Sequence, residues 1–205
     1  VKLDGKQNLR LWRLPMKESG RDLLLATMQH ENTMRVPWVP FAGIHSGKLA
    51  GYKGIEIFKD GHKLLESLLA VHEVYKPDGQ PVMFDLQVEA EILGCQLLWS
   101  ENAPPSVASH PLAGTLEVPT HLPEKSQGRL PLILEVMQKF KGEVGDNTAL
   151  FGLVTGPFTL ASHLRGTDIF LDFVDHEDFL FDLLRYTTQV CKRMTDFYID
   201  AGMDV

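Results

Sequence analysis

The sequence predicts an α/β fold of parallel strands covered by outer helices, equivalent to the amino-terminal portion of an eight-stranded (β/α)8 barrel. Apolar runs too short for helices, such as 150–154, alternate with segments of helical period. Within 150–166 a strand, the tight turn Thr155-Gly156-Pro157 and a helix start follow one another directly. Three such strand–helix units and the start of a fourth strand fill the 205 residues, about half of such a barrel.

The first part of the chain predicts a tail, a helix and a strand. Residues 1–18 lack a clear period, and we expect an amino-terminal tail there. A helix is predicted over 19–30, because Ser19 and Asp22 stand in a capping-box arrangement. The apolar run 36–44 predicts a strand, since its prolines suit a strand start or an edge.

The middle of the chain predicts two helices around a second strand. Residues 58–75 have an amphipathic helical pattern, and 81–86 form a buried strand, after which a short helix begins at 88–93. Residues 100–123 are rich in Pro, Ser and His without periodicity, so we expect an excursion that covers a site. A further helix is predicted over 130–140.

The last helix has the clearest pattern. Asp175 is its predicted cap, and Asp178 lies in the first turn, where the helix dipole favours negative charge. Gly202 ends it, and 203–205 begin a fourth strand, from which we infer a truncated chain. The predicted apolar face contains Leu180, Leu183, Leu184, Thr187, Val190, Cys191, Met194, Phe197, Tyr198 and Ala201.

Composition narrows the function classes. A net charge of -7 argues against nucleic-acid and polybasic membrane partners, which need clustered Lys and Arg. No run approaches the ~20 apolar residues of a membrane span, and the first residues lack the apolar core of a signal peptide. Cys95 and Cys191 lie in segments predicted as core, so we expect a reducing cytoplasmic setting, no disulfide and no zinc site from these two alone. We expect one domain over 19–205.

Asp85 is the first candidate for chemistry. It lies at or near the carboxyl end of the apolar strand at 81–86. A carboxylate there must be hydrogen-bonded or functional, since burying an unpaired charge costs several kcal/mol. It serves either as an anion on the floor of a pocket or as a structural acceptor for a neighbouring loop, and both alternatives stay open.

The other candidates are weaker. His163 falls about one turn into the helix after Gly156-Pro157, where it acts as an acid, a base or a hydrogen-bonding group, or is simply a packed helix residue. His45 lies in a polar loop after a predicted strand, in the site or facing solvent. Glu89 and Glu91 are expected to face solvent or cap a loop. Motifs of phosphate-binding loops, zinc proteases and serine hydrolases are missing from the sequence.

The carboxyl ends of parallel strands face one crevice, so we expect the first three strands to converge on one cavity. The proposed catalytic residues are Asp85 and His163, and the proposed substrate-binding residues are His45, Gly43, Phe84, Gly156 and Phe158.

These motifs together resemble the uroporphyrinogen decarboxylase superfamily. Residues 150–166 are similar to its strand and glycine-proline turn, and Phe84-Asp85-Leu86 followed by Leu93-Gly94 is similar to its second strand. Residues 198–205 resemble its approach to the fourth strand, so the resemblance covers most of 20–205. It implies a (β/α)8 TIM barrel. In the decarboxylase branch it implies that Asp85 contacts the pyrrole N–H groups of a tetrapyrrole, without a cofactor.

Departures from the decarboxylases favour the family's other branch. The two arginines that bind substrate carboxylates after the first strand are Ala42 and Ser46 here, and the tyrosine of the third-strand turn is His163. Alanine cannot supply the bidentate binding of arginine. The segments 88–94 and 105–111 are more similar to corrinoid-dependent methyltransferases. In that branch zinc activates a thiol acceptor, and its His-x-Cys and cysteine ligands lie outside this chain.

The resemblance therefore implies a zinc- and corrinoid-dependent methyltransferase that acts on a methylated corrinoid and a thiol. The alternative enzyme is uroporphyrinogen decarboxylase, a carboxy-lyase of porphyrin biosynthesis that needs no cofactor. Expected partners are a corrinoid protein or a tetrapyrrole, with a homodimer left open. Two further alternatives are a non-catalytic module that binds a corrinoid protein and a small open α/β sandwich complete in itself.

Overall fold

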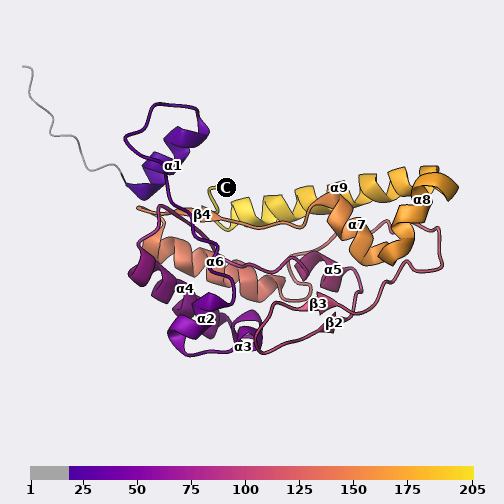
Figure 1. The fold of residues 1–205 in the computed structure, drawn as a ribbon, viewed down its shortest axis with the longest axis horizontal. Coiled ribbons are helices and arrows are strands. Elements are labelled where there is room, and N and C mark those ends of the chain that lie inside the picture. The colour runs from indigo at the N-terminus through magenta and orange to yellow at the C-terminus, as the bar shows by residue number, and fades with distance from the viewer. Residues whose placement is uncertain (1–18) are drawn as a thin grey trace, which may run out of the picture.

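The computed structural model of the protein describes residues 19–205, in which helices surround a short pair of parallel strands (Figure 1). The predicted tail at 1–18 lies outside the described residues. Strands β1 (Gly79–Pro81) and β4 (Ala149–Phe151) pair in parallel, with Gly79 opposite Ala149. Ala149 and Leu150 are fully buried, as expected for a parallel pair covered on both faces.

Helices make up most of the remaining regular structure. Strands β2 (Leu97–Leu98) and β3 (Ser106–Val107) form a separate antiparallel pair at the start of the excursion. The helices are α1 (Gly20–Met28), α2 (His45–Ala50), α3 (Gly54–Lys59), α4 (Gly61–Tyr75), α5 (Val88–Ile92), α6 (Leu130–Val144), α7 (Pro157–Arg165), α8 (Ile169–Asp175) and α9 (Glu177–Asp200), with the 3-10 turn η1 (Gly166–Asp168) between α7 and α8.

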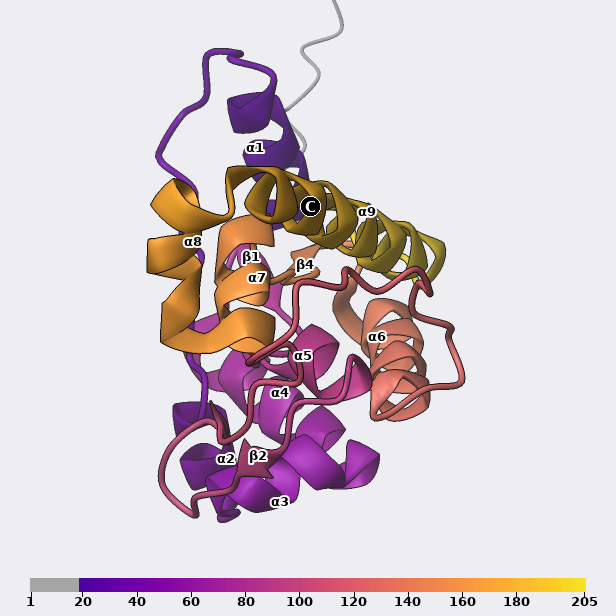
Figure 2. The same ribbon diagram turned by 90° about the vertical axis from the view of Figure 1, so that its right-hand side faces the viewer.

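The helices pack on the strands through one continuous core. In Figure 1, β4 lies between α9 and α6, while α7 and α8 lie at the amino-terminal end of α9. Figure 2 shows β1 and β4 at the centre, with α4 and α6 beside them and α1 close to the end of the chain. The largest fully buried side chains come from α3, α6, β4, α7, α8 and α9, so strands and outer helices share this core.

The predicted first strand over 36–44 is wrong in detail. Residues 36–42 are extended beside β1 but form no strand, and 43–44 turn into α2. The carbonyl of Trp38 accepts the N–H groups of Asp78 (3.0 Å) and Gly79 (3.4 Å). Pro37 and Pro40 have no N–H to donate, which explains why a regular ladder does not form.

The other strands are shorter than predicted or displaced. The strand predicted over 81–86 is β1, which ends at Pro81, although the N–H of Val82 still donates to the carbonyl of Phe151 (3.1 Å). The strand predicted over 150–154 is β4. At the end of the chain, Gly152 N–H donates to Val205 O (2.9 Å) and Asp204 N–H to Leu150 O (2.8 Å), so 203–205 run alongside β4 as a further strand requires.

The structure confirms the predicted cap of the first helix and changes the bounds of two others. Ser19 Oγ accepts the N–H of Asp22 (3.1 Å) at the start of α1. The helix predicted over 58–75 is divided, because the side chain of Asp60 caps α4 and separates it from α3. The helix predicted over 130–140 is α6, which continues to Val144.

The predicted cap at Asp175 is wrong. Asp175 is the last residue of α8, a helix that the sequence analysis did not predict, and α9 begins after His176 without a side-chain cap. A helical backbone at Asp175 excludes the extended conformation that an N-cap needs. The buried face of α9 does follow the predicted spacing, from Leu180 to Tyr198.

Helix α1 closes the amino-terminal end of the strand pair. Its first turn packs on the residues before β1 and β4, where Arg21 N–H donates to Asn147 O (2.9 Å). The guanidinium of Arg21 lies 2.7 Å from Asp204 Oδ1, and Lys141 Nζ lies 2.9 Å from the same carboxylate. Helix α1 therefore does not cover the carboxyl ends of β1 and β4, where the candidate site lies.

Acid should weaken this closure at Asp78, the residue directly before β1 on which the first turn of α1 packs. Hydrogen bonds from the Arg35 guanidinium lower the pKa of Asp78, and the Trp38 N–H adds to them against the effect of burial. A depressed folded-state pKa gives stability that is complete above the unfolded value of about 3.9 and is lost as the pH falls below it. We expect Asp78→Asn to unfold with a weaker pH dependence than the wild type between about pH 5 and about pH 2.

Thermal unfolding followed by circular dichroism across this range measures the effect. Asp182→Asn is the matched control, because Asp182 pairs with Arg185 on the exposed surface of α9. Equal acid dependence in the wild type and Asp78→Asn would contradict the proposed role of this pair.

Candidate functional site

Two turns meet where β1 and β4 end. After β1 the chain passes through Asp85 into α5, and after β4 it passes through Thr155 into α7. Thr155 N–H donates to Glu89 Oε1 (3.1 Å), and Thr155 Oγ1 lies 2.6 Å from Leu86 O. The carboxyl ends of parallel strands are where α/β proteins bind ligands, so this edge is the candidate site.

Asp85 is buried and held by protein groups. Its side chain is 0% exposed, and Oδ2 lies 2.6 Å from Arg129 Nη1. Oδ1 accepts the N–H of Gln87 (2.9 Å). This geometry corresponds to the structural-acceptor alternative, in which the carboxylate organises the turn after β1 and a guanidinium balances its charge.

Arg129 connects this turn to the start of α6. Its Nε lies 2.6 Å from Glu91 Oε2, so one guanidinium serves two carboxylates. Its plane lies over the ring of Trp99, 4.9 Å from the centroid. Arg129 was not among the predicted site residues, because it stands in a stretch of the sequence without periodicity. The one signal in the sequence was a basic residue directly before a predicted helix. Its closeness to the strand-end acid Asp85 becomes visible only in the fold.

Glu89 does not face solvent, which was one of its two predicted alternatives, but it caps a loop, which was the other, because it accepts the N–H of Thr155 in the turn after β4. It is 1% exposed, and burial raises its pKa although the backbone N–H of Thr155 donates a hydrogen bond to it. Cys191 Sγ, on α9, donates to Thr155 O (2.9 Å). Burial raises the pKa of the Cys191 thiol to about 11, so it remains a protonated donor.

His163 contacts the excursion and not the turn after β1. Its carbonyl accepts from His110 Nδ1 (2.8 Å) and Cys95 Sγ (3.4 Å). Burial, followed by the neighbouring His110, lowers the pKa of His163, so its imidazole is neutral near pH 7. Its Nδ1 is buried and has no hydrogen-bond partner among the described residues. This nitrogen is therefore free to donate or accept one further hydrogen bond.

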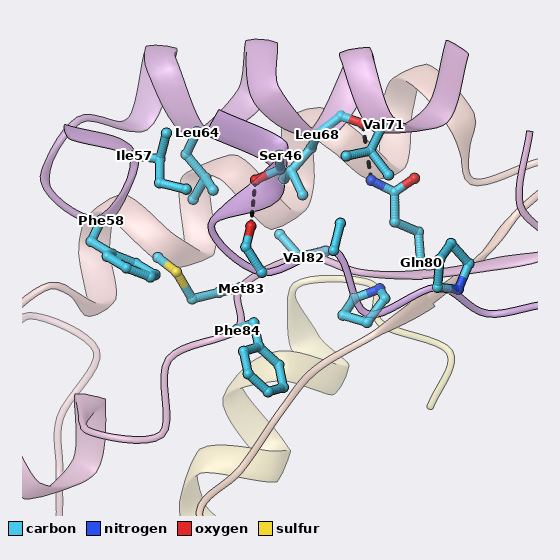
Figure 3. Close-up of a pocket in the computed structure, with 14 residues that line it drawn as sticks. Ser46, Ile57, Phe58, Leu64, Leu68, Val71, Gln80, Val82, Met83 and Phe84 are labelled. Atoms are coloured by element: carbon cyan, nitrogen blue, oxygen red, sulfur yellow. Dashed lines mark hydrogen bonds between the residues drawn. The ribbon is translucent and has the colours of Figure 1, made fainter. Parts of the chain in front are cut away.

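Gly43 and Phe84 line one small cavity beneath α2 and α4 (Figure 3). Its volume is about 20 Å³, room for about one water molecule. Ser46, on its wall, donates its hydroxyl to Gly43 O (2.7 Å). His45 Nε2 lies 2.7 Å from the hydroxyl of Tyr75 at the end of α4. The cavity is a packing space and not a tetrapyrrole pocket.

Gly156 and Phe158 lie together at the start of α7. Gly156 is the N-cap residue, and a Cβ added there would meet no atom within 4 Å, so the turn is open. Phe158 is 40% exposed, and its ring centroid lies 6.1 Å from those of Phe170 and Phe173 on α8. Thus the structure joins Gly43 with Phe84 and Gly156 with Phe158. Asp85, His163 and His45 have separate partners.

Residues 19–205 offer neither a metal-binding cluster nor a membrane-spanning helix. These residues contain no group of three His, Cys, Asp or Glu side chains that could hold a metal ion. Cys95 and Cys191 are free thiols, and each donates to a backbone carbonyl. Within the same range, every helix is too short or too polar to cross a bilayer.

Comparisons with known proteins match this fold. The family model for uroporphyrinogen decarboxylase (URO-D) matches residues 19–205. The methylcobamide:CoM methyltransferase MtbA of Methanosarcina acetivorans is 26% identical over 190 residues, covering 90% of this chain and 56% of the relative. A uroporphyrinogen decarboxylase of Nostoc punctiforme is 28% identical over 99 residues. That match covers 48% of this chain and 28% of the length of the decarboxylase.

A solved methyltransferase from Methanosarcina mazei has the same fold, with a TM-score of 0.83 and 24% identity. The match covers 91% of this chain and 57% of that structure. The chain therefore spans a little over half the length of these methyltransferases.

Removing Arg129 should destabilise the protein strongly. In Arg129→Met the carboxylate of Asp85 stays buried without its cation, and breaking such a pair costs about 3–5 kcal/mol. Lys139→Met is the matched control, because Lys139 and Glu135 are both more than half exposed, and it should cost about 0–1 kcal/mol. Urea unfolding measures both. A loss below about 1 kcal/mol for Arg129→Met would show that its pair with Asp85 does not hold the turn after β1 in place.

Proposed function

Because the chain belongs to the uroporphyrinogen decarboxylase family, we propose that the protein is a corrinoid-dependent methyltransferase that moves a methyl group from a methylated corrinoid to a thiol. The observation that carries this proposal is the match to methylcobamide:CoM methyltransferases over 90% of the chain. The decarboxylase match covers about half of it.

The charges at the candidate site support the methyltransferase over the decarboxylase. Ala42 and Ser46 occupy the positions where the decarboxylases carry two arginines, and Ser46 is buried with its hydroxyl bonded to Gly43. Arg129 is bound to two carboxylates of its own chain. A substrate with eight carboxylates would need cationic partners that these positions do not provide.

The site is proposed at the carboxyl-terminal edge of a (β/α)8 TIM barrel, in a domain over 19–205. The parallel register of β1 and β4 supports this. We propose that Asp85 holds the turn after β1 in place through Arg129, and that the neutral imidazole of His163 donates or accepts a hydrogen bond. Substrate would lie toward His45, Gly43, Phe84, Gly156 and Phe158.

Zinc does not fit the described residues. Their Cys95 and Cys191 are protonated thiols bonded to carbonyls, whereas zinc needs thiolates, and no three candidate ligands come together. The proposal therefore assigns zinc ligands to other residues of the protein. The corrinoid is a substrate here, presented by a corrinoid protein as partner.

Methyl transfer can be measured on the full protein with methylcob(III)alamin as donor and coenzyme M as acceptor. We expect the spectrum of cob(I)alamin to appear together with the methyl thioether, detected by mass spectrometry. Asp85→Asn should lower kcat/KM roughly 10²-fold, because the turn after β1 would lose its anchor and a displacement of substrate-binding groups by about 1 Å has an effect of that size.

Glu91→Gln is the control for that variant, since Glu91 shares Arg129 but is 28% exposed, and it should change the rate only slightly. Release of CO2 from uroporphyrinogen without methyl transfer would instead identify the decarboxylase. If the protein catalyses neither reaction but binds a corrinoid protein tightly, it is a non-catalytic module.

A further inference from the structure

The hydroxyl of Thr155 has two oxygen neighbours and one hydrogen. Thr155 Oγ1 lies 2.6 Å from Leu86 O and 2.9 Å from Glu89 Oε2. A backbone carbonyl cannot donate, so the hydrogen on the shorter contact must come from Thr155. The contact to Glu89 then needs a hydrogen from the carboxyl group.

We propose that Glu89 is a neutral carboxylic acid in the folded protein and that it positions the turn between β4 and α7. Its Oε2–H donates to Thr155 Oγ1, and its Oε1 accepts the N–H of Thr155. Every hydrogen bond in the group then has one donor and one acceptor. An ionised Glu89 would leave two oxygens facing each other across 2.9 Å without a proton.

The groups around Glu89 agree with a neutral acid. Asp85, which faces it from the segment after β1, is already paired with Arg129. From α9, Cys191 donates its thiol to Thr155 O, and Tyr198 is buried with a raised pKa caused first by burial. The cation nearby, Arg129, is bound to Asp85 and Glu91, and among residues 19–205 no ion pair to Glu89 is found.

The network fixes all three polar groups of Thr155. Its N–H, hydroxyl and carbonyl are bonded to Glu89, Leu86 and Cys191, which belong to two parts of the chain, the segment after β1 and helix α9. The next residue, Gly156, caps α7. The contribution of this turn to catalysis rests on the proposed function, but the protonation of Glu89 does not.

Infrared spectroscopy of the full protein with 13C-labelled glutamate carboxyl groups tests the protonation directly. At neutral pH we expect a carbonyl band of a protonated carboxylic acid, which is lost in Glu89→Gln and kept in Glu91→Gln. If Glu89→Gln does not fold, Thr155→Val provides a second test, since loss of the hydroxyl should shift the same band. Absence of the band from the wild type would overturn the proposal.

The pH dependence of stability gives an independent test. A carboxyl whose folded pKa is raised contributes stability fully below the unfolded value of about 4.3, and this is lost as pH rises toward the folded pKa. The folding equilibrium constant of the wild type should therefore fall about tenfold per pH unit relative to Glu89→Gln across this window. A constant ratio between about pH 5 and about pH 7 would overturn the proposal, whatever the protein catalyses.

Discussion

The parallel pairing of β1 with β4 determines where the groups of the candidate site lie. Both strands end at the same edge, so the turns that follow them must pass side by side. The contacts of Thr155 with Leu86 and Glu89 join these turns, and α1 closes the opposite end. A change in register would separate Thr155 from Glu89 and leave buried polar groups without partners, which costs more than losing the bonds alone.

The sequence predicted the helices better than the strands. A helix pattern is local: the spacing of α9 and the cap at Ser19 depend on neighbours in the chain. Strand ends depend on partners far away, so the ladder at Pro81 and the proline-interrupted segment at 36–42 could not be placed from local pattern. Helix α8 was missed because its exposed apolar residues, such as Phe170 and Val174, have no amphipathic pattern.

The position of Asp85 could be predicted from the strand pattern, but its partner could not. Arg129 is 44 residues away in the sequence and stands after an irregular excursion. Glu89 shows the same limit, since a glutamate in the first turn of a short helix usually faces solvent. Only the packing of α9 and the turn after β4 buries it. The environment of a buried ionisable group depends on contacts between distant segments, which local sequence patterns do not reveal.

The central claim is that the edge where β1 and β4 end is the ligand-binding face of the protein. A crystal structure of the full protein soaked with methylcob(III)alamin tests it most directly. We expect electron density for the corrinoid against this edge, in contact with the open turn at Gly156. Density bound at the opposite end of the strands, against α1, would contradict it.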